Sequence, residues 1–242
     1  MKKIAILLLG LVLIYSCSTS TDENSIEIIE TYIDGPNITD IDGNTYQSVI
    51  NCGLTFTKQN LNVSKYSDGT PIPEVTDAIQ WANLTTGAWC YYSNTTANGT
   101  TYGKLYNWYA VVGIYDAASA NNPSLRKKLA PMGWHVPTDN EWRQLRDCLG
   151  GESVAGGKMK STSLWQSPNT GATNESGFLG LPGGYRTNGG IFDSVGNYGF
   201  WWSSSEFNTT SAWIPYLKYY HGLSSRYHYY KGNGFSVRCL RD

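Results

Sequence analysis

The residues best suited to chemistry gather near the C-terminus, between positions 213 and 231. Tyrosine, serine, histidine and glycine alternate there, which combines rigid aromatic surface with adaptable hydrogen-bonding groups. This mixture is typical of surfaces that bind ligands non-covalently. An ordinary tyrosine-rich pair of surface strands is the alternative interpretation. Counting two tryptophans just upstream, we predict ligand contacts from Trp201, Trp202, Tyr216, Tyr219, Tyr220, His221, Ser224, Ser225, Tyr227, His228, Tyr229 and Tyr230.

Few residues of the sequence are suited to catalysis. His135 lies just before a predicted helix, where a histidine most often packs structurally. Asp139 and Glu141 are sufficiently explained as acids that favour a helix N-terminus. His221 and His228 have no obvious acid partner. We therefore expect a protein that is not an enzyme and that uses no metal and no cofactor.

The start of the chain has the pattern of an export signal. Two lysines precede an apolar run over residues 4–14, which is shorter than the roughly 20 residues of a membrane-spanning helix. The run ends in Ile-Tyr-Ser-Cys, which resembles a bacterial lipobox and implies acylation of Cys17. We predict a signal peptide over residues 1–16, and a lipidated cysteine with a polar tether over 17–38. A secretory signal with an incidental cysteine is the alternative.

The predicted tether also bears on location. Asp22 and Glu23 resemble the acidic export tags of surface lipoproteins in Bacteroidetes-type bacteria, although a plain solvated linker is equally compatible with them. We expect an outer membrane lipoprotein at the cell surface, attached to the membrane through its lipid. The formal net charge of −1 gives no indication of a nucleic-acid partner, which needs a basic face.

Composition suits one loop-rich domain with several cysteines. The chain is 14% aromatic and 15% charged and contains 26 glycines. Four cysteines follow the lipobox: Cys52, Cys90, Cys148 and Cys239. They form no C-x-x-C pair and no zinc-ligand spacing. An exported compartment permits disulfides, and the sequence leaves all three connectivities open.

The elements that position these side chains are short and separated by turns. Residues 40–46 (DIDGNTY) predict a tight turn and then a strand, and we place the domain start at residue 39. A first helix is predicted over 102–112. A second begins at Thr138, whose spacing to Glu141 is that of a capping box, and stops at Gly150-Gly151. Short aromatic strands follow, so the predicted class is α+β.

Several phrases of the chain together resemble one family. They are DIDGNTYQSV (40–49), QNLNVSKYSDGTPIP (59–73), WANLTTGAWCYY (81–92), YGKLYNWYAV (102–111), LAPMGWHVPTDNEW (129–142), GGYR (183–186), WWSSSE (201–206) and GFSVRCLRD (234–242). In this order they resemble the Fibrobacter succinogenes major paralogous domain over residues 39–242. Through WHVPTDNEW and GFSVR, that family is in turn similar to the C-type lectin-like superfold, in its formylglycine-generating-enzyme branch.

The resemblance implies a C-type lectin-like domain with two helices, short irregular antiparallel strands and long loops, whose N- and C-terminal strands pair. Formylglycine generation uses two close C-terminal cysteines that bind copper, and only Cys239 is present there. The Ser167-Pro168-Asn169 segment lacks the acid that calcium-dependent sugar binding would need. Cys90 and Cys239 lie within family-like phrases, so the resemblance favours a disulfide between them, with Cys52 and Cys148 paired or free.

These observations favour a non-enzymatic binding or adhesion protein. We expect an unidentified protein or glycan ligand on the aromatic C-terminal face. A structural surface lipoprotein without a specific ligand is the second interpretation. The C-terminal segment also resembles the variable segment of lectin-fold proteins diversified by retroelements, which would make the chain a variable binding protein.

Overall fold

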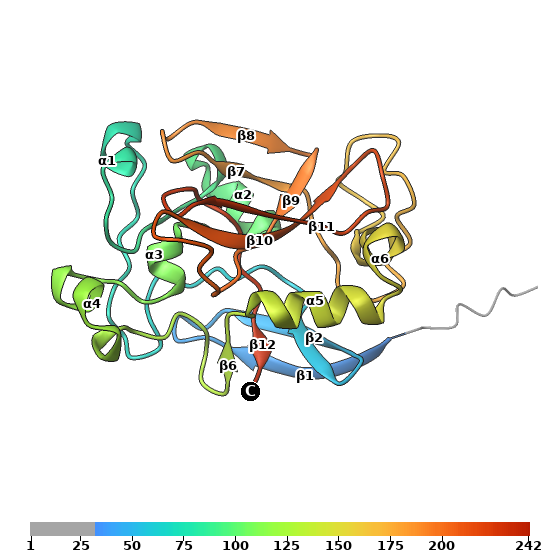
Figure 1. Ribbon diagram of the computed structural model, residues 1–242, viewed down its shortest axis with the longest axis horizontal. Helices are drawn as coiled ribbons and strands as arrows, with labels where there is room; N and C mark the ends of the chain where they lie inside the picture. The colour runs from blue at the N-terminus through green and yellow to red at the C-terminus, as the bar shows by residue number, and fades with distance from the viewer. Residues whose placement is uncertain (1–31) are drawn as a thin grey trace, which may run out of the picture.

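A strand is present ahead of the predicted domain start. The computed structural model describes residues 32–242 (Figure 1). The predicted signal peptide, Cys17 and most of the predicted tether lie outside these residues. Strand β1 (Ile33–Thr39) pairs antiparallel with β2 (Thr45–Asn51). The predicted tether, 17–38, is therefore too long and the domain start at 39 too late, because β1 already belongs to a sheet.

A five-stranded sheet brings β1 and the C-terminal strand together. Its order is β1-β2-β3-β12-β6, in which β3 is Leu54–Thr57, β6 is Trp134–His135 and β12 is Leu240–Arg241. Strand β12 pairs antiparallel with β3 on one side and with β6 on the other. Figure 1 shows this sheet along the lower edge of the molecule. The last strand thereby fixes the C-terminus against the first three strands.

A buried carboxylate holds the turn between β1 and β2. One oxygen of Asp40 accepts hydrogen bonds from the backbone N–H groups of Asp42 (2.9 Å) and Asn44 (3.0 Å). Its other oxygen accepts from the Asn44 side-chain amide (2.8 Å) and from the Tyr46 hydroxyl (2.5 Å). Gly43 between them has a φ of 86°, which favours glycine. The predicted Asp-Gly turn and the strand after it are confirmed.

Helix α5 (Asp139–Cys148) is the second helix that the sequence predicted. Thr138 is its N-cap, and both hydrogen bonds of the capping box to Glu141 are present. Trp142 and Leu145 are buried, as the apolar spacing predicts. The helix ends before Gly150, which has a φ of 106°. A further helix, α6 (Glu152–Met159), follows at once.

The first predicted helix, over 102–112, is mostly wrong. Helix α2 (Thr96–Tyr102) ends where it was expected to begin, because Gly103 takes a φ of 72°. Leu105–Tyr106 form strand β5, which pairs with β4 (Trp89–Cys90). Asn107 then caps the single turn α3 (Trp108–Val111). The other short helices are α1 (Ala78–Ala82), α4 (Ala117–Asn121) and the 3-10 turns η1 (Tyr92–Asn94) and η2 (Pro123–Leu125).

A second sheet faces α5 from the opposite side. It contains β9 (Tyr198–Phe200), β10 (Ser211–Lys218) and β11 (Ser225–Tyr230) in the order β11-β10-β9. Strands β7 (Gly183–Arg186) and β8 (Phe192–Val195) pair beside it. Figure 1 shows α5 between this layer and the five-stranded sheet. Phe56, Trp142 and Leu217 belong to one buried cluster that fills the space between the two layers. The class is α+β, as predicted.

Buried cations satisfy the carbonyl groups of the long loops. The Arg238 guanidinium is fully buried and donates to the carbonyl oxygens of Thr57, Phe178 and Leu179 at 2.6–2.9 Å. Lys160 likewise donates to three carbonyl oxygens, and burial lowers the pKa of its ammonium group to about 8. Because buried carbonyl groups need donors, these side chains supply what a regular sheet would provide.

The predicted disulfide between Cys90 and Cys239 is wrong. Cys52 is bonded to Cys148, which ties the turn after β2 to the end of α5. Cys90 and Cys239 are free and buried. Cys90 packs in the cluster around Trp81, whereas Cys239 packs in a separate cluster, so the two thiols do not meet. Burial also raises the pKa of the Cys90 thiol to about 12, which keeps it protonated and unreactive.

Candidate functional site

Two of the twelve predicted contact residues belong to the core. Trp201 and Trp202 are fully buried. The Trp201 indole N–H donates to the Asn60 side-chain oxygen (2.9 Å), and that of Trp202 donates to the Tyr106 carbonyl oxygen (2.7 Å). Their prediction as ligand contacts is wrong, because neither ring has a surface that a ligand can reach.

Three predicted tyrosines of the β10–β11 hairpin pack against buried residues of the core. Tyr216 and Tyr229 are half-buried and pack against Phe200, with ring centroids 5.7 and 6.0 Å away. Tyr219 packs against the buried cluster beside α5. These rings fix the sheet in place, and Tyr229 alone of the three also lines an open groove.

Four predicted residues do meet, in a groove at strand β11. The groove has a volume of about 370 Å³. Tyr227 and Tyr230 are 52% and 59% exposed, so two large aromatic side chains of this strand are open to solvent. Three residues that the sequence did not predict complete the lining. The whole set is Asn208, Thr210, Ser211, Tyr227, His228, Tyr229 and Tyr230.

A stack of rings continues the groove toward the preceding loop. The His228 ring lies 3.8 Å from that of Phe207 and 4.6 Å from that of Tyr227, and the planes differ by 13° and 11°. Phe207 is itself 42% exposed. Flat, partly exposed rings of this kind offer contact area at low entropic cost. Phe207 was not predicted as a contact residue, because it lies in a polar loop.

Strand β11 has an open edge. It is the outer strand of its sheet, and His228 and Arg226 lie opposite Trp213 and Pro215 of β10. Trp213 makes its backbone hydrogen bonds with Ser203 and Ser205, on the other side of β10, and the Pro215 carbonyl accepts from Trp201. In an antiparallel pair the residues between hydrogen-bonded positions direct their backbone groups away from the partner. The backbone groups of Arg226 and His228 therefore face outward.

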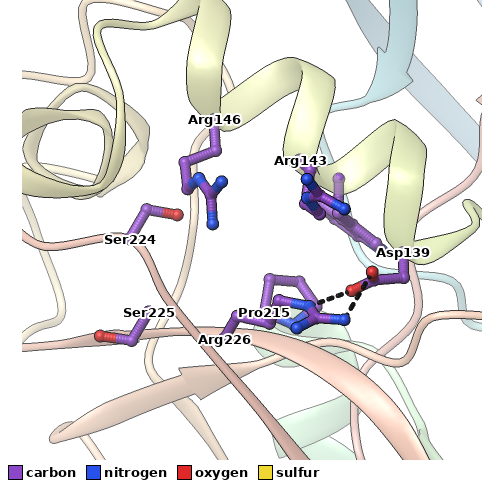
Figure 2. Close-up of a pocket in the computed structure, with 8 residues that line it drawn as sticks. Asp139, Arg143, Arg146, Pro215, Ser224, Ser225 and Arg226 are labelled. Atoms are coloured by element: carbon purple, nitrogen blue, oxygen red, sulfur yellow. Dashed lines mark hydrogen bonds and ion pairs between the residues drawn. The ribbon is translucent and has the colours of Figure 1, made fainter. Parts of the chain in front are cut away.

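Figure 2 shows where the predicted serines lie, in a notch between α5 and β11. Ser224 directs its hydroxyl toward Arg146 of α5, whereas the Ser225 hydroxyl points away from the arginines, and both serines line the notch with Arg143 and Arg146. Arg226 makes two hydrogen bonds to Asp139, of 2.6 and 2.8 Å. The space left is about 10 Å³, which is the size of a single water. The notch therefore joins β11 to α5, and neither serine lines the groove at strand β11.

The remaining predicted residues, Tyr220 and His221, lie in the loop after β10. Tyr220 is 46% exposed and packs edge-on against Tyr219. His221 Nδ1 accepts from the Leu223 backbone N–H (3.2 Å), and burial lowers the pKa of its ring. Neither residue lines the tyrosine groove.

His135 connects the C-terminus to helix α5, in agreement with a structural role at the helix entrance. Its Nδ1 lies 2.7 Å from the Asp242 carboxylate and its Nε2 lies 3.0 Å from that of Glu141. Both ring nitrogens are thereby occupied. Across residues 32–242, no group of three or more histidine, cysteine, aspartate or glutamate side chains is arranged to hold a metal ion.

The structure is an α+β domain whose first and last strands, β1 and β12, lie in one sheet. An aromatic groove lies at the edge of a second sheet. The chain belongs to the Fibrobacter succinogenes major domain family, whose model matches residues 52–241. This confirms the family that the sequence phrases resembled. No curated protein and no solved structure matches the chain. Within residues 32–242, none of the helices has the length and hydrophobicity needed to cross a membrane.

Proposed function

We propose that this chain is a lipid-anchored, non-enzymatic binding or adhesion protein of the bacterial cell surface. In this proposal Cys17 carries the lipid, and a polar tether ahead of β1 holds the domain off the outer membrane. The domain then presents the groove of β11 to a protein or glycan ligand. The observation that carries the proposal is the groove itself, where Tyr227 and Tyr230 are more than half exposed beside an open strand edge.

The chemistry of the groove supports binding. Exposed aromatic rings contribute most of the affinity at many interfaces, and Asn208 and Thr210 add polar groups at the rim. A rigid base lies underneath, because Tyr229 packs on Phe200 and Phe235. A preorganised surface binds with a smaller entropic cost than a flexible one.

We further propose a C-type lectin-like arrangement for the domain. The resemblance implies that the terminal strands of such a domain pair, and here β12 lies in one sheet with β1, β2 and β3. The long loops and the small second sheet lie on the other side of α5 (Figure 1). An experimental structure in which β12 is separated from β3 would refute this part of the proposal.

The binding proposal is tested with the full-length lipoprotein on arrays of glycans and of cell-surface proteins. We expect at least one ligand that the wild type binds and that the double variant Tyr227→Ala with Tyr230→Ala binds at least tenfold more weakly. Met132→Ala is the matched control, because Met132 is 93% exposed and lies outside the groove. Unchanged binding by the double variant, or no bound ligand on either array, would overturn the proposal.

The anchor is tested in cells grown with an alkyne-labelled fatty acid. We expect label on the wild type and none on Cys17→Ser, and we expect protease added to intact cells to remove the wild-type protein. A labelled Cys17→Ser variant would contradict the lipid anchor, and a protein that resists added protease would contradict the surface location.

A further inference from the structure

A polar cavity lies apart from the tyrosine groove, between the start of β2 and helix α2. Its volume is about 310 Å³, at the lower end of the range for small-molecule sites. Most of its lining residues are of carboxamide, hydroxyl or glycine type, and none of the lining side chains is charged. The lining residues are Asn44, Thr45, Tyr46, Gln59, Asn60, Asn62, Gly99, Thr100, Thr101, Gly103 and Leu181.

Asn62 presents a fixed hydrogen-bond donor to this cavity. The Lys104 ammonium donates to the Asn62 side-chain oxygen (3.2 Å) and to its backbone oxygen (2.5 Å). An ammonium group can only donate, so the oxygen of the carboxamide must face Lys104 and its NH₂ group must face away. Within residues 32–242, no acceptor binds that NH₂ group. Because Lys104 is 5% exposed, the carboxamide is held from behind by a buried group.

Asn44 presents the complementary acceptor. Its NH₂ group donates to the Asp40 carboxylate (2.8 Å) and more weakly to the Asn62 carbonyl oxygen (3.4 Å). A carboxylate only accepts, so the Asn44 side-chain oxygen must point the other way. No donor within the described part of the chain reaches that oxygen. Asp40 is itself fixed by the turn, which leaves Asn44 little rotational freedom.

The rest of the wall adds hydroxyl groups. Thr100 and Thr101 are exposed, and their hydroxyls can donate and accept. Gly99 and Gly103 let this wall pack closely against the residues behind it. A Cβ atom at Gly99 would come within 2.1 Å of the Tyr91 ring, and one at Gly103 would come within 2.8 Å of the Leu61 carbonyl oxygen. The cavity therefore combines uncommitted donors and acceptors with no net charge.

We infer that this cavity is a binding site for a neutral sugar unit, with the vicinal hydroxyls of the ring bridging Asn44 and Asn62. Each hydroxyl both donates and accepts, which matches a wall that offers a fixed acceptor and a fixed donor. An anion would meet the outward Asn44 oxygen, and a cation would meet the outward Asn62 NH₂ group. A purely apolar ligand would leave both groups unpaired, which costs free energy.

The site is separate from the proposed groove of β11, with which it shares no residue. Two of the phrases that carry the family resemblance meet in it, since Asn44 lies in DIDGNTYQSV and Asn62 in QNLNVSKYSDGTPIP. Because the two sites share no residue, a substitution in one can abolish binding there and leave binding at the other unchanged.

The test is saturation-transfer NMR on the full-length lipoprotein in a sugar-free zwitterionic detergent. The probes are the methyl glycosides of glucose, galactose, mannose, xylose, fucose and N-acetylglucosamine. Asn62→Asp keeps an oxygen for Lys104 but replaces the donating NH₂ group with a charged acceptor, so we expect binding at least tenfold weaker. Asn140→Asp is the matched control, because it makes the same chemical change on the exposed start of α5. Thr101→Val removes one hydroxyl at an exposed position and should weaken binding several-fold.

The groove variant separates this inference from the proposed function. Tyr227→Ala with Tyr230→Ala should leave glycoside binding unchanged even if it abolishes binding of the groove ligand. Two results would overturn the inference: no saturable signal from any of these glycosides with the wild type, or equal affinity for the wild type, Asn62→Asp and Thr101→Val. If Asn62→Asp does not fold, Thr101→Val decides the question alone.

Discussion

Replacing Cys148 with serine tests how the helix layer is fastened to the five-stranded sheet. Both cysteines of the bridge are exposed, so serine introduces no buried polar group and opens no cavity. The change in the free energy of unfolding therefore reports the covalent link. Cys148→Ser should still fold, because Trp142 and Leu145 keep their buried contacts.

The size of the effect follows from the length of the closed loop. The two cysteines are 96 residues apart. The chain-entropy model gives about 4–5 kcal/mol for a loop of this length, and measured values are often smaller, so we expect a loss of about 3–5 kcal/mol. A loss of this size is a large share of the stability of a domain, which is about 5–15 kcal/mol.

Urea denaturation followed by tryptophan fluorescence measures this loss. The wild type should lose about as much stability on reduction as Cys148→Ser loses without it. Reductant should have no further effect on the double variant Cys52→Ser with Cys148→Ser. If reductant still destabilises that double variant, or if peptide mapping links Cys90 to Cys239, then the account of the cysteines is wrong.

Three further predictions concern polar side chains that hold the loops and helix α5 in place. Arg238→Met should lower the free energy of unfolding by about 3–5 kcal/mol, because it removes donors from buried carbonyl oxygens. Urea denaturation measures this loss, and a loss below about 1 kcal/mol would contradict the prediction. The pKa of Lys160 is about 8 in the folded state and 10.5 for the free side chain, so the native state loses this proton first and the unfolded state holds more protons in this window. The stability of the wild type relative to Lys160→Met should therefore rise between pH 8 and pH 10.5, and a flat or falling difference would refute the assignment. Glu141→Ala removes one half of the α5 capping box and should cost about 1 kcal/mol in thermal or urea unfolding, whereas an unchanged midpoint would show that the box contributes little.

The parts of the fold that the sequence predicted are those fixed by local chemistry. The Asp-Gly turn and the capping box of α5 depend on residues within three or four positions of one another, so their spacing is visible in the sequence. The helix expected over 102–112 failed because Gly103 and Asn107 interrupt it with their own local preferences. The start of the domain was misplaced because β1 is recognisable chiefly through its pairing with β2.

The site was harder to predict because exposure depends on the packing of distant segments. Composition placed aromatic residues near the C-terminus, but it did not distinguish Trp202, which is buried, from Tyr227, which is exposed. The serines of the same segment line the notch beside α5 instead of the groove (Figure 2). The disulfide was open for a similar reason, since sequence permits three connectivities and only the approach of Cys52 to Cys148 selects one.

The measurement that tests the central claim most directly is hydrogen exchange of the full-length protein with and without the ligand that the arrays identify. We predict that the ligand slows amide exchange at residues 207–211 and 225–230, with the largest change at the outward N–H groups of Arg226 and His228. Strands β3 and β12, which pair with each other and line neither the groove nor the cavity beside α2, should exchange at the same rate in both samples. Protection confined to any other surface, with β11 unchanged, would contradict the claim that its aromatic edge is the binding face.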